Sequence, residues 1–160
     1  MGLERNILVH EAAKIIQKPL EPLGYKLVED PPRKSFEFWF EKEPSSAENL
    51  YRIIEFQPSG FGRTDLFELA INLMRRSYRD YDNPPKDFVR TGVLHMRLAP
   101  QLWEKGNTAM DNWWHFTSVN ELRDCYADVL DKLIKYGIPY LEDINVSRAN
   151  WWDNFADPRM

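Results

Sequence analysis

The chain has 160 residues and a formal net charge of -4, and 43% of its residues are hydrophobic and 29% charged. Such a length and composition predict one domain with one core and lie outside the disordered class. The acidic balance argues against a nucleic-acid partner, and Glu4, His10 and Glu11 interrupt any apolar run that would make a secretory or transmembrane segment.

The first predicted element is an amphipathic helix over residues 8–20. Its apolar residues fall on one arc of a helical wheel, and its charged residues fall on the opposite arc. Pro19, Pro22 and Gly24 are expected to end this helix, because proline supplies no backbone N–H and clashes with the preceding turn.

Two strands are expected next, at residues 25–29 and 35–41. In the second of these strands, three Phe side chains face one way, and Glu37, Trp39 and Glu41 face the other. This alternation is typical of a strand with one face in the core.

Residues 50–73 form the centre of the predicted fold, a β-hairpin whose arms are separated by a Pro-Ser-Gly-Phe-Gly turn. On both arms apolar residues recur at every second position, which places them on one face of a pleated strand. The residues assigned to this core-facing set are Ile54, Phe56, Phe67, Leu69, Ile71 and Leu73. Such a face needs a cover, which helices at the two ends of the chain can supply.

Residues 75–90 are predicted to be a loop or a short helix without a clear pattern, since they combine four Arg, three Asp and two adjacent prolines. Strands are expected at residues 93–98 and 111–116. In the first of them, Leu94, Met96 and Leu98 face one way, and His95 and Arg97 face the other.

The last predicted helix begins at Ser118, which forms a capping box with Glu121 three residues later. An apolar stripe continues from Val119 to Leu133. Gly137 is expected to end the helix in the left-handed conformation, ahead of an Ile-Pro pair.

Together these elements predict an α+β fold, with an antiparallel sheet of five or six strands covered on one face by the N-terminal and C-terminal helices. Residues 1–143 are expected to form the single domain. Residues 144–160 are expected to form an aromatic tail that packs on this domain or on a partner.

The order of several short motifs resembles an uncharacterised bacterial family, a domain of unknown function. The motifs are Pro-Leu-Gly-Tyr at residues 22–25, Glu-Phe-Gln at 55–57, His-Met-Arg-Leu at 95–98, the Trp pair at 113–114 and Ile-Pro-Tyr-Leu-Glu at 138–142. The resemblance covers residues 12–142, without the loop at 75–90. It implies an α+β fold and implies no activity.

A polar face is predicted on the side of the sheet opposite the helices. Its residues are Glu37, Trp39, Glu41, Glu55, Gln57, Glu68, Asn72, His95 and Arg97. The default interpretation is a solvated face with cross-strand charge pairs. The alternative is a ligand site of Glu55, Gln57, Glu68, His95 and Arg97. In this site Arg97 would bind a carboxylate or phosphate through its planar guanidinium, beside His95 as a proton carrier.

No catalytic, cofactor or metal site is predicted. His10-Glu11 lacks the second His of a zincin motif, because Lys14 occupies that position, and no other metal-ligand spacing is present. Cys125 has no obvious cationic neighbour that would lower its pKa. As the only cysteine it allows no intramolecular disulfide, which favours the cytoplasm as the compartment.

The tryptophans have two interpretations. Trp113, Trp114, Trp151 and Trp152 either fill the core or act as anchors of an interface with a protein partner or a second copy of the chain. The leading hypothesis is a protein-interaction module, such as an immunity-like or adaptor protein. The alternative is a small-ligand-binding protein or enzyme that uses the polar sheet face.

Overall fold

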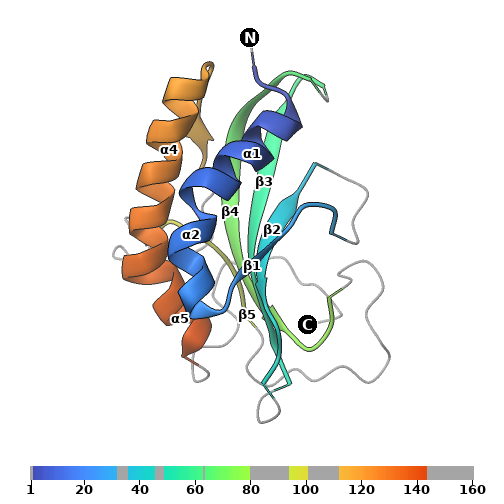
Figure 1. Cartoon of the computed structure of the whole chain (residues 1–160), viewed down its shortest axis with the longest axis vertical. Coiled ribbons are helices and arrows are strands. Elements are labelled where there is room, and N and C mark those ends of the chain that lie inside the picture. Colours follow the sequence, from blue (N-terminus) through green and yellow to red (C-terminus); the bar gives the residue numbers. More distant parts are fainter. Residues whose placement is uncertain are drawn as a thin grey trace.

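The computed structural model describes residues 2–31, 36–45, 49–62, 64–79, 94–100 and 112–143. In these residues an antiparallel sheet carries a layer of helices on one face (Figure 1). Most of the predicted loop at 75–90, residues 101–111 and the predicted tail at 144–160 lie outside the described residues.

The sheet has the order β1-β2-β3-β4-β5, and β6 also pairs with β4. Its strands are β1 (Lys26–Val28), β2 (Phe38–Lys42), β3 (Tyr51–Gly60), β4 (Leu66–Arg76), β5 (Leu94–Arg97) and β6 (Trp114–His115). Every neighbouring pair is antiparallel. The predicted α+β fold with five or six antiparallel strands is therefore confirmed.

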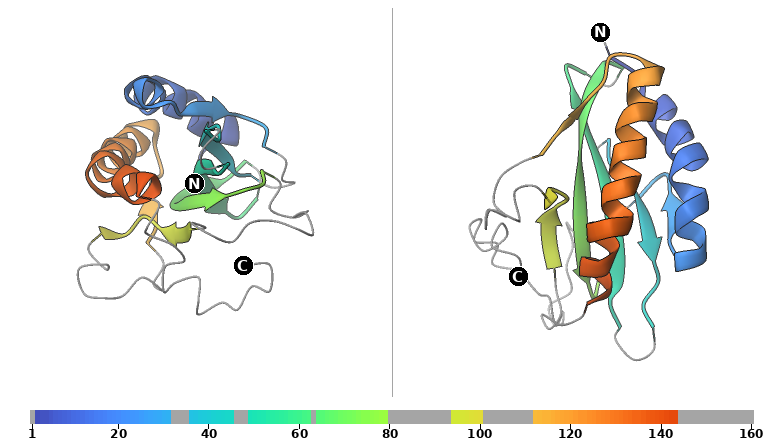
Figure 2. Two further views of the ribbon diagram at one scale, coloured as in Figure 1. Left: turned by 90° about the horizontal axis from the view of Figure 1, so that it is seen from below. Right: turned by 90° about the vertical axis from the view of Figure 1, so that its left-hand side faces the viewer.

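The helices are α1 (Arg5–Ile15), α2 (Gln17–Leu20), the 3-10 turn η1 (Glu21–Leu23), α4 (Val119–Lys132), the π-helical turn η2 (Leu133–Gly137) and α5 (Ile138–Glu142). Helices α1 and α4 lie side by side on the same face of the sheet (Figure 2). The cover by N-terminal and C-terminal helices is thus as predicted. Within the described residues, no helix has the length and apolar character needed to cross a membrane.

The N-terminal helix is interrupted before it ends. Helix α1 stops at Ile15, whose carbonyl would pair with residue 19 in a continuous α-helix, but Pro19 has no N–H to donate. The chain then winds through α2 and η1 to Gly24, which has φ 94°. The prolines and Gly24 therefore act as expected, with the final stop at the glycine.

The prediction that Gly137 ends the last helix is wrong. Gly137 has φ -66° and ψ -52°, which are right-handed helical angles, and the chain continues helically to Glu142. Ile138 donates its N–H to the carbonyl of Leu133, five residues back. This wider turn lets Pro139 enter the first turn of α5, where a missing N–H costs little.

Gly137 is instead required for close approach to the sheet. A Cβ at this position would lie 3.1 Å from Cδ2 of Leu133 and 3.3 Å from Cδ1 of Leu98. The absence of a side chain lets the helical layer contact the sheet at this point.

The predicted assignment of side chains to the two faces of the hairpin is confirmed for most of the hairpin's length. Phe56 of β3 contacts Phe38 and Phe40 of β2, with ring centroids 5.1 and 5.6 Å apart. It also forms a T-shaped contact with Tyr126 of α4, with ring centroids 5.7 Å apart. The Tyr126 hydroxyl donates to the carbonyl of Leu8 in α1, 2.8 Å away. The phenylalanine faces therefore pack beneath the helices.

Two details of the hairpin prediction are wrong. The register shifts between Ser59 and Gly60, so that Gly60 is opposite Leu66. Leu66 is buried in the core, whereas Phe67 is only half-buried and lies outside the core cluster. At the other end, β4 continues through Arg76, so the predicted loop cannot begin at residue 75.

Candidate functional site

One row of side chains crosses the second face of the sheet. In the strand register, Trp39 lies opposite Glu55, Glu55 lies opposite Asn72, and Asn72 lies opposite Arg97. Opposite residues of antiparallel strands share a face, so four neighbouring strands bring these side chains together.

The polar members of this row are hydrogen-bonded to one another. Arg97 Nη1 donates to Oε1 of Gln57 at 2.8 Å and to Oδ1 of Asn72 at 2.6 Å. Asn72 Nδ2 donates to Oε1 of Glu55 at 2.7 Å and to Oε1 of Gln57 at 2.9 Å. We call Glu55, Gln57, Asn72 and Arg97 the Arg97 network.

Glu55, Asn72 and Arg97 of the Arg97 network are buried, and Gln57 is half-buried. Glu55 is 1% exposed and Arg97 is 7% exposed. The guanidinium carbon of Arg97 lies 5.3 Å from the ring centroid of Trp113, a cation–π arrangement. Arginine, amides and carboxylate therefore form a pre-organised polar cluster in a region shielded from water, where hydrogen bonds are strong.

The five predicted ligand residues are only partly brought together. Glu55, Gln57 and Arg97 meet in the network, but Glu68 lies four residues along β4 from Asn72, which is roughly 13 Å of strand. Glu68 pairs instead with His115 of β6, with Nε2 and Oε2 3.1 Å apart.

His95 lies on the same face as Arg97, two residues away on β5 and opposite Met74. It borders a small apolar cluster of Trp39, Ile53 and Met74. Ligand binding by His95 and by the other four residues stays a prediction.

The default expectation of a solvated face does not hold for this part of the sheet. Glu37 and Glu41 are each 8% exposed, and Glu41 accepts hydrogen bonds from Trp39 at 3.3 Å and Arg79 at 2.9 Å. Alternation predicts which face a side chain shares, but it does not predict whether that face is buried.

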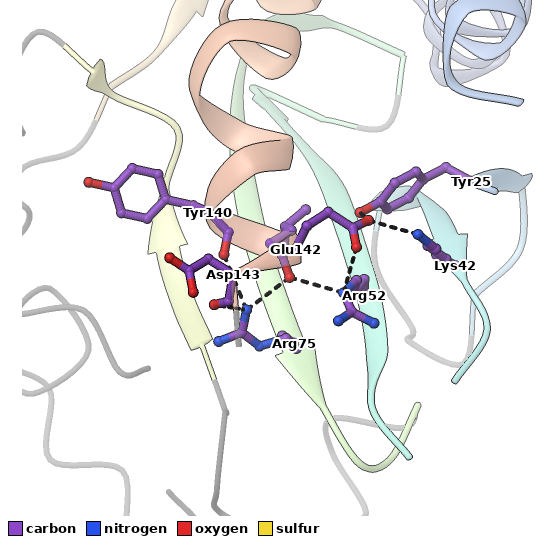
Figure 3. A network of polar contacts seen from close by, with 8 residues as sticks. Tyr25, Lys42, Arg52, Arg75, Tyr140, Glu142 and Asp143 are labelled. Carbon is purple, nitrogen blue, oxygen red and sulfur yellow. Dashed lines mark hydrogen bonds and ion pairs between the residues drawn. The ribbon is translucent and has the colours of Figure 1, made fainter. Parts of the chain in front are cut away.

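Two buried arginines on the helical face were not predicted from the sequence. Arg52 and Arg75 lie directly opposite one another on β3 and β4. Arg75 Nη1 donates to the carbonyls of Tyr140, Leu141 and Asp143 at 3.1, 2.8 and 2.8 Å (Figure 3). Two like charges so placed repel, but here they face the carbonyl end of α5, where cations are favoured.

The alternation of residues in the sequence does indicate where these two arginines lie. Arg52 precedes Ile54 by two residues, and Arg75 follows Leu73 by two, so alternation places both arginines on the apolar face. We call Arg52, Arg75 and their acceptors at the end of α5 the arginine clamp.

Glu142 completes the arginine clamp. Its Oε1 accepts from the Tyr25 hydroxyl at 3.0 Å and from Lys42 at 2.9 Å, and its Oε2 lies 3.5 Å from Arg52 Nε (Figure 3). Burial raises the pKa of Glu142, but hydrogen bonds from Lys42 and Tyr25 and the charge of Arg52 outweigh it, so the pKa is lowered overall. Burial and the nearby carboxylate raise the pKa of Tyr25.

An aromatic hollow is lined by residues of the hairpin and of the segment that leads into α4. The turn end of the hairpin lies beside the N-terminus and the start of α4 (Figure 1). Phe61 is 88% exposed, and its ring centroid lies 5.2 Å from that of Phe67. The hollow has a volume of about 320 Å³ and is lined by Phe61, Phe67, His115, Phe116 and Thr117. We call this surface the aromatic hairpin end.

A larger hollow of about 830 Å³ lies along α1 and the start of α4. Some of its charged groups are engaged within the protein: Arg123 donates to both carboxylate oxygens of Glu11, at 3.0 and 3.1 Å. Hydrogen bonding from Arg123 lowers the pKa of Glu11. Arg5 donates to the backbone carbonyls of Glu29 and Phe36.

Cys125 is not activated as a nucleophile. Burial and the negative charge of Asp124 raise the pKa of its thiol, and the sulfur contacts the carbonyl of His115 at 3.3 Å. In the described part of the chain, no group of three His, Cys, Asp or Glu side chains is arranged to hold a metal ion.

The tryptophans have different environments. Trp114 belongs to the core, and its Nε1 donates to Oδ2 of Asp128 at 2.8 Å, which fits the core-filling interpretation. Trp113 is half-buried beside Arg97. The interface interpretation of Trp151 and Trp152 concerns residues outside the described ones.

Comparison of the chain with protein-family models, curated proteins and solved structures gives no match. The family resemblance therefore stays a prediction.

Proposed function

We propose that the chain is a protein-interaction module that docks through the aromatic hairpin end. The observation that carries this proposal is the side chain of Phe61, which is 88% exposed at the tip of the hairpin. Burying a phenylalanine side chain is worth roughly 1.5–3 kcal/mol. Aromatic residues are also enriched in protein interfaces.

A comparison with the polar face of the sheet supports the aromatic hairpin end as the binding surface. A small-ligand site needs convergent polar groups that line an open pocket. In the Arg97 network, Arg97, Asn72 and Glu55 converge, but they hydrogen-bond one another and are buried. At the aromatic hairpin end, an apolar surface faces solvent instead.

Affinity capture with two matched variants tests the proposal. The full chain, Phe61→Ser and Ile134→Ser are each used as bait in extracts of the cells that naturally produce the protein. Ile134 is 46% exposed on the helical layer and is the control for general loss of apolar surface. We expect a defined protein to be retained by the wild type and Ile134→Ser and lost by Phe61→Ser. Equal capture by all three baits would overturn the proposal.

A second candidate function is binding of a small anion at the Arg97 network. The observation that favours it is that Nη1 of Arg97 is held by the uncharged amides of Gln57 and Asn72. These contacts hold the guanidinium in a fixed orientation, and its planar donors have the geometry that binds a carboxylate or phosphate.

A thermal-shift screen of carboxylates, phosphates and other metabolites tests this second candidate. Binding at the network predicts that Arg97→Ala abolishes the shift. Arg79→Ala, which removes an arginine that is 43% exposed, retains it. Equal shifts in both variants, or no shift in the wild type, would contradict it.

A further inference from the structure

We infer that the partner segment bound by the aromatic hairpin end is a basic peptide carrying one large apolar side chain. This inference rests on the proposed function and specifies the chemistry of the partner. It depends on two properties of the surface, an apolar hollow of limited size and an acidic rim.

The hollow fits an anchor side chain better than a metabolite. Its volume of about 320 Å³ is at the lower end of the range of roughly 300–1,000 Å³ that is typical of small-molecule pockets. Three of its five lining residues are phenylalanines, Phe61, Phe67 and Phe116. An aliphatic or aromatic side chain is therefore the expected occupant.

The rim of the hollow is acidic. Glu68 contacts the lining residue His115, with 3.1 Å between Oε2 and Nε2. Glu121 accepts from the backbone N–H and the hydroxyl of the lining residue Thr117, at 2.7 and 2.6 Å. These hydrogen bonds lower the pKa of Glu121, so its carboxylate stays ionised at neutral pH.

The negative charge continues onto α4. Asp124 is exposed three residues after Glu121, a spacing that places the two on one side of the helix. Within the described residues, neither carboxylate has a Lys or Arg partner. Arg123, the arginine nearest to them in sequence, forms an ion pair with Glu11 of α1. Arg63 lies outside the described residues.

Charge complementarity selects the partner. Lys or Arg side chains flanking the anchor would lie against Glu121 and Asp124, whereas an acidic peptide would be repelled. In a two-fold dimer built on this surface, each acidic rim would face its own copy. A partner of opposite charge is therefore favoured over a second copy of the chain.

Selection from a random peptide library on the immobilised full chain tests this inference. Enriched peptides are then measured by fluorescence polarisation against four variants. Phe61→Ser removes the aromatic wall, and Glu121→Gln with Asp124→Asn removes the negative charge of the rim on α4. Gln keeps the acceptor oxygen of the capping box. Ile134→Ser and Asp131→Asn are the apolar and acidic controls, since both residues are exposed elsewhere on the helical layer.

The expected peptides carry Lys or Arg around one aromatic or aliphatic residue. Phe61→Ser is expected to weaken their binding about tenfold or more, because a buried phenylalanine contact is lost. The double rim variant is expected to weaken binding roughly threefold and to reduce its salt dependence. The two controls are expected to bind like the wild type.

The other outcomes separate this inference from the proposed function. Enriched peptides that Phe61→Ser loses, but that are acidic or indifferent to the rim variant, would overturn the basic partner and leave the docking surface in place. Peptides that bind Phe61→Ser and wild type equally would overturn the docking surface itself. Failure to enrich any peptide would also overturn this inference, whereas the proposed function is decided by the capture experiment.

Discussion

Replacing Arg75 with methionine is expected to destabilise the fold strongly, although Arg75 contacts no predicted site. Arg75 is completely buried, and its Nη1 donates to the carbonyls of Tyr140, Leu141 and Asp143. Nη1 has two hydrogens, so the three acceptors share roughly two charge-assisted bonds of about 1.5–3 kcal/mol each. Relief of repulsion from Arg52 returns roughly 0.2–1 kcal/mol.

Methionine also removes the cost of taking the guanidinium out of water on folding. The net loss of stability is therefore expected to be about 2–4 kcal/mol. For a chain of this size, such a loss lowers Tm by about 5–15 °C. Urea unfolding followed by tryptophan fluorescence measures the change. Lys135→Met is the matched control, because Lys135 is 61% exposed and forms an exposed ion pair with Asp131, so a change below about 0.5 kcal/mol is expected. If Arg75→Met is no more destabilising than this control, the arginine clamp does not hold α5.

Three further predictions concern the helical layer. Gly137→Ala is expected to lower stability by about 1–3 kcal/mol in urea unfolding, because the new Cβ overpacks against Leu133; an unchanged or higher stability would contradict the close approach. Glu142→Gln is expected to be destabilising at pH 7 but less so in acid, because the pKa of Glu142 is lowered in the folded state. The carboxylate's contribution to stability is fully present above about pH 4.5, the ordinary pKa, and is lost as the pH falls through the folded pKa. A penalty independent of pH would argue against this linkage. Tyr126→Phe is expected to cost about 1 kcal/mol by loss of the hydrogen bond to Leu8, and a neutral substitution would show that this bond does not contribute.

Much of the fold could be predicted because the periodic signals were local. The alternation of Phe38, Phe40 and Phe56 predicts the buried face of β2 and β3. The capping box predicts the start of α4, where the Ser118 side chain accepts from the N–H of Glu121. The errors arise where a non-local contact overrides a local preference. The clearest case is Gly137, whose missing side chain is used for packing against Leu98 and not for a left-handed turn.

The candidate sites were harder to predict for the same reason. Alternation places Glu55, Gln57 and Arg97 on one face, but only the register between β4 and β5 makes Asn72 the residue that joins them. Register depends on pairing between distant segments, which periodicity does not encode. The exposure of Phe61 depends likewise on where the hairpin turns.

Docking through the aromatic hairpin end can be measured by hydroxyl-radical footprinting of the full chain with and without its captured partner. Oxidation of Phe61 is expected to fall on binding while oxidation of Ile134 is unchanged. Undiminished oxidation of Phe61 in the saturated complex would contradict it.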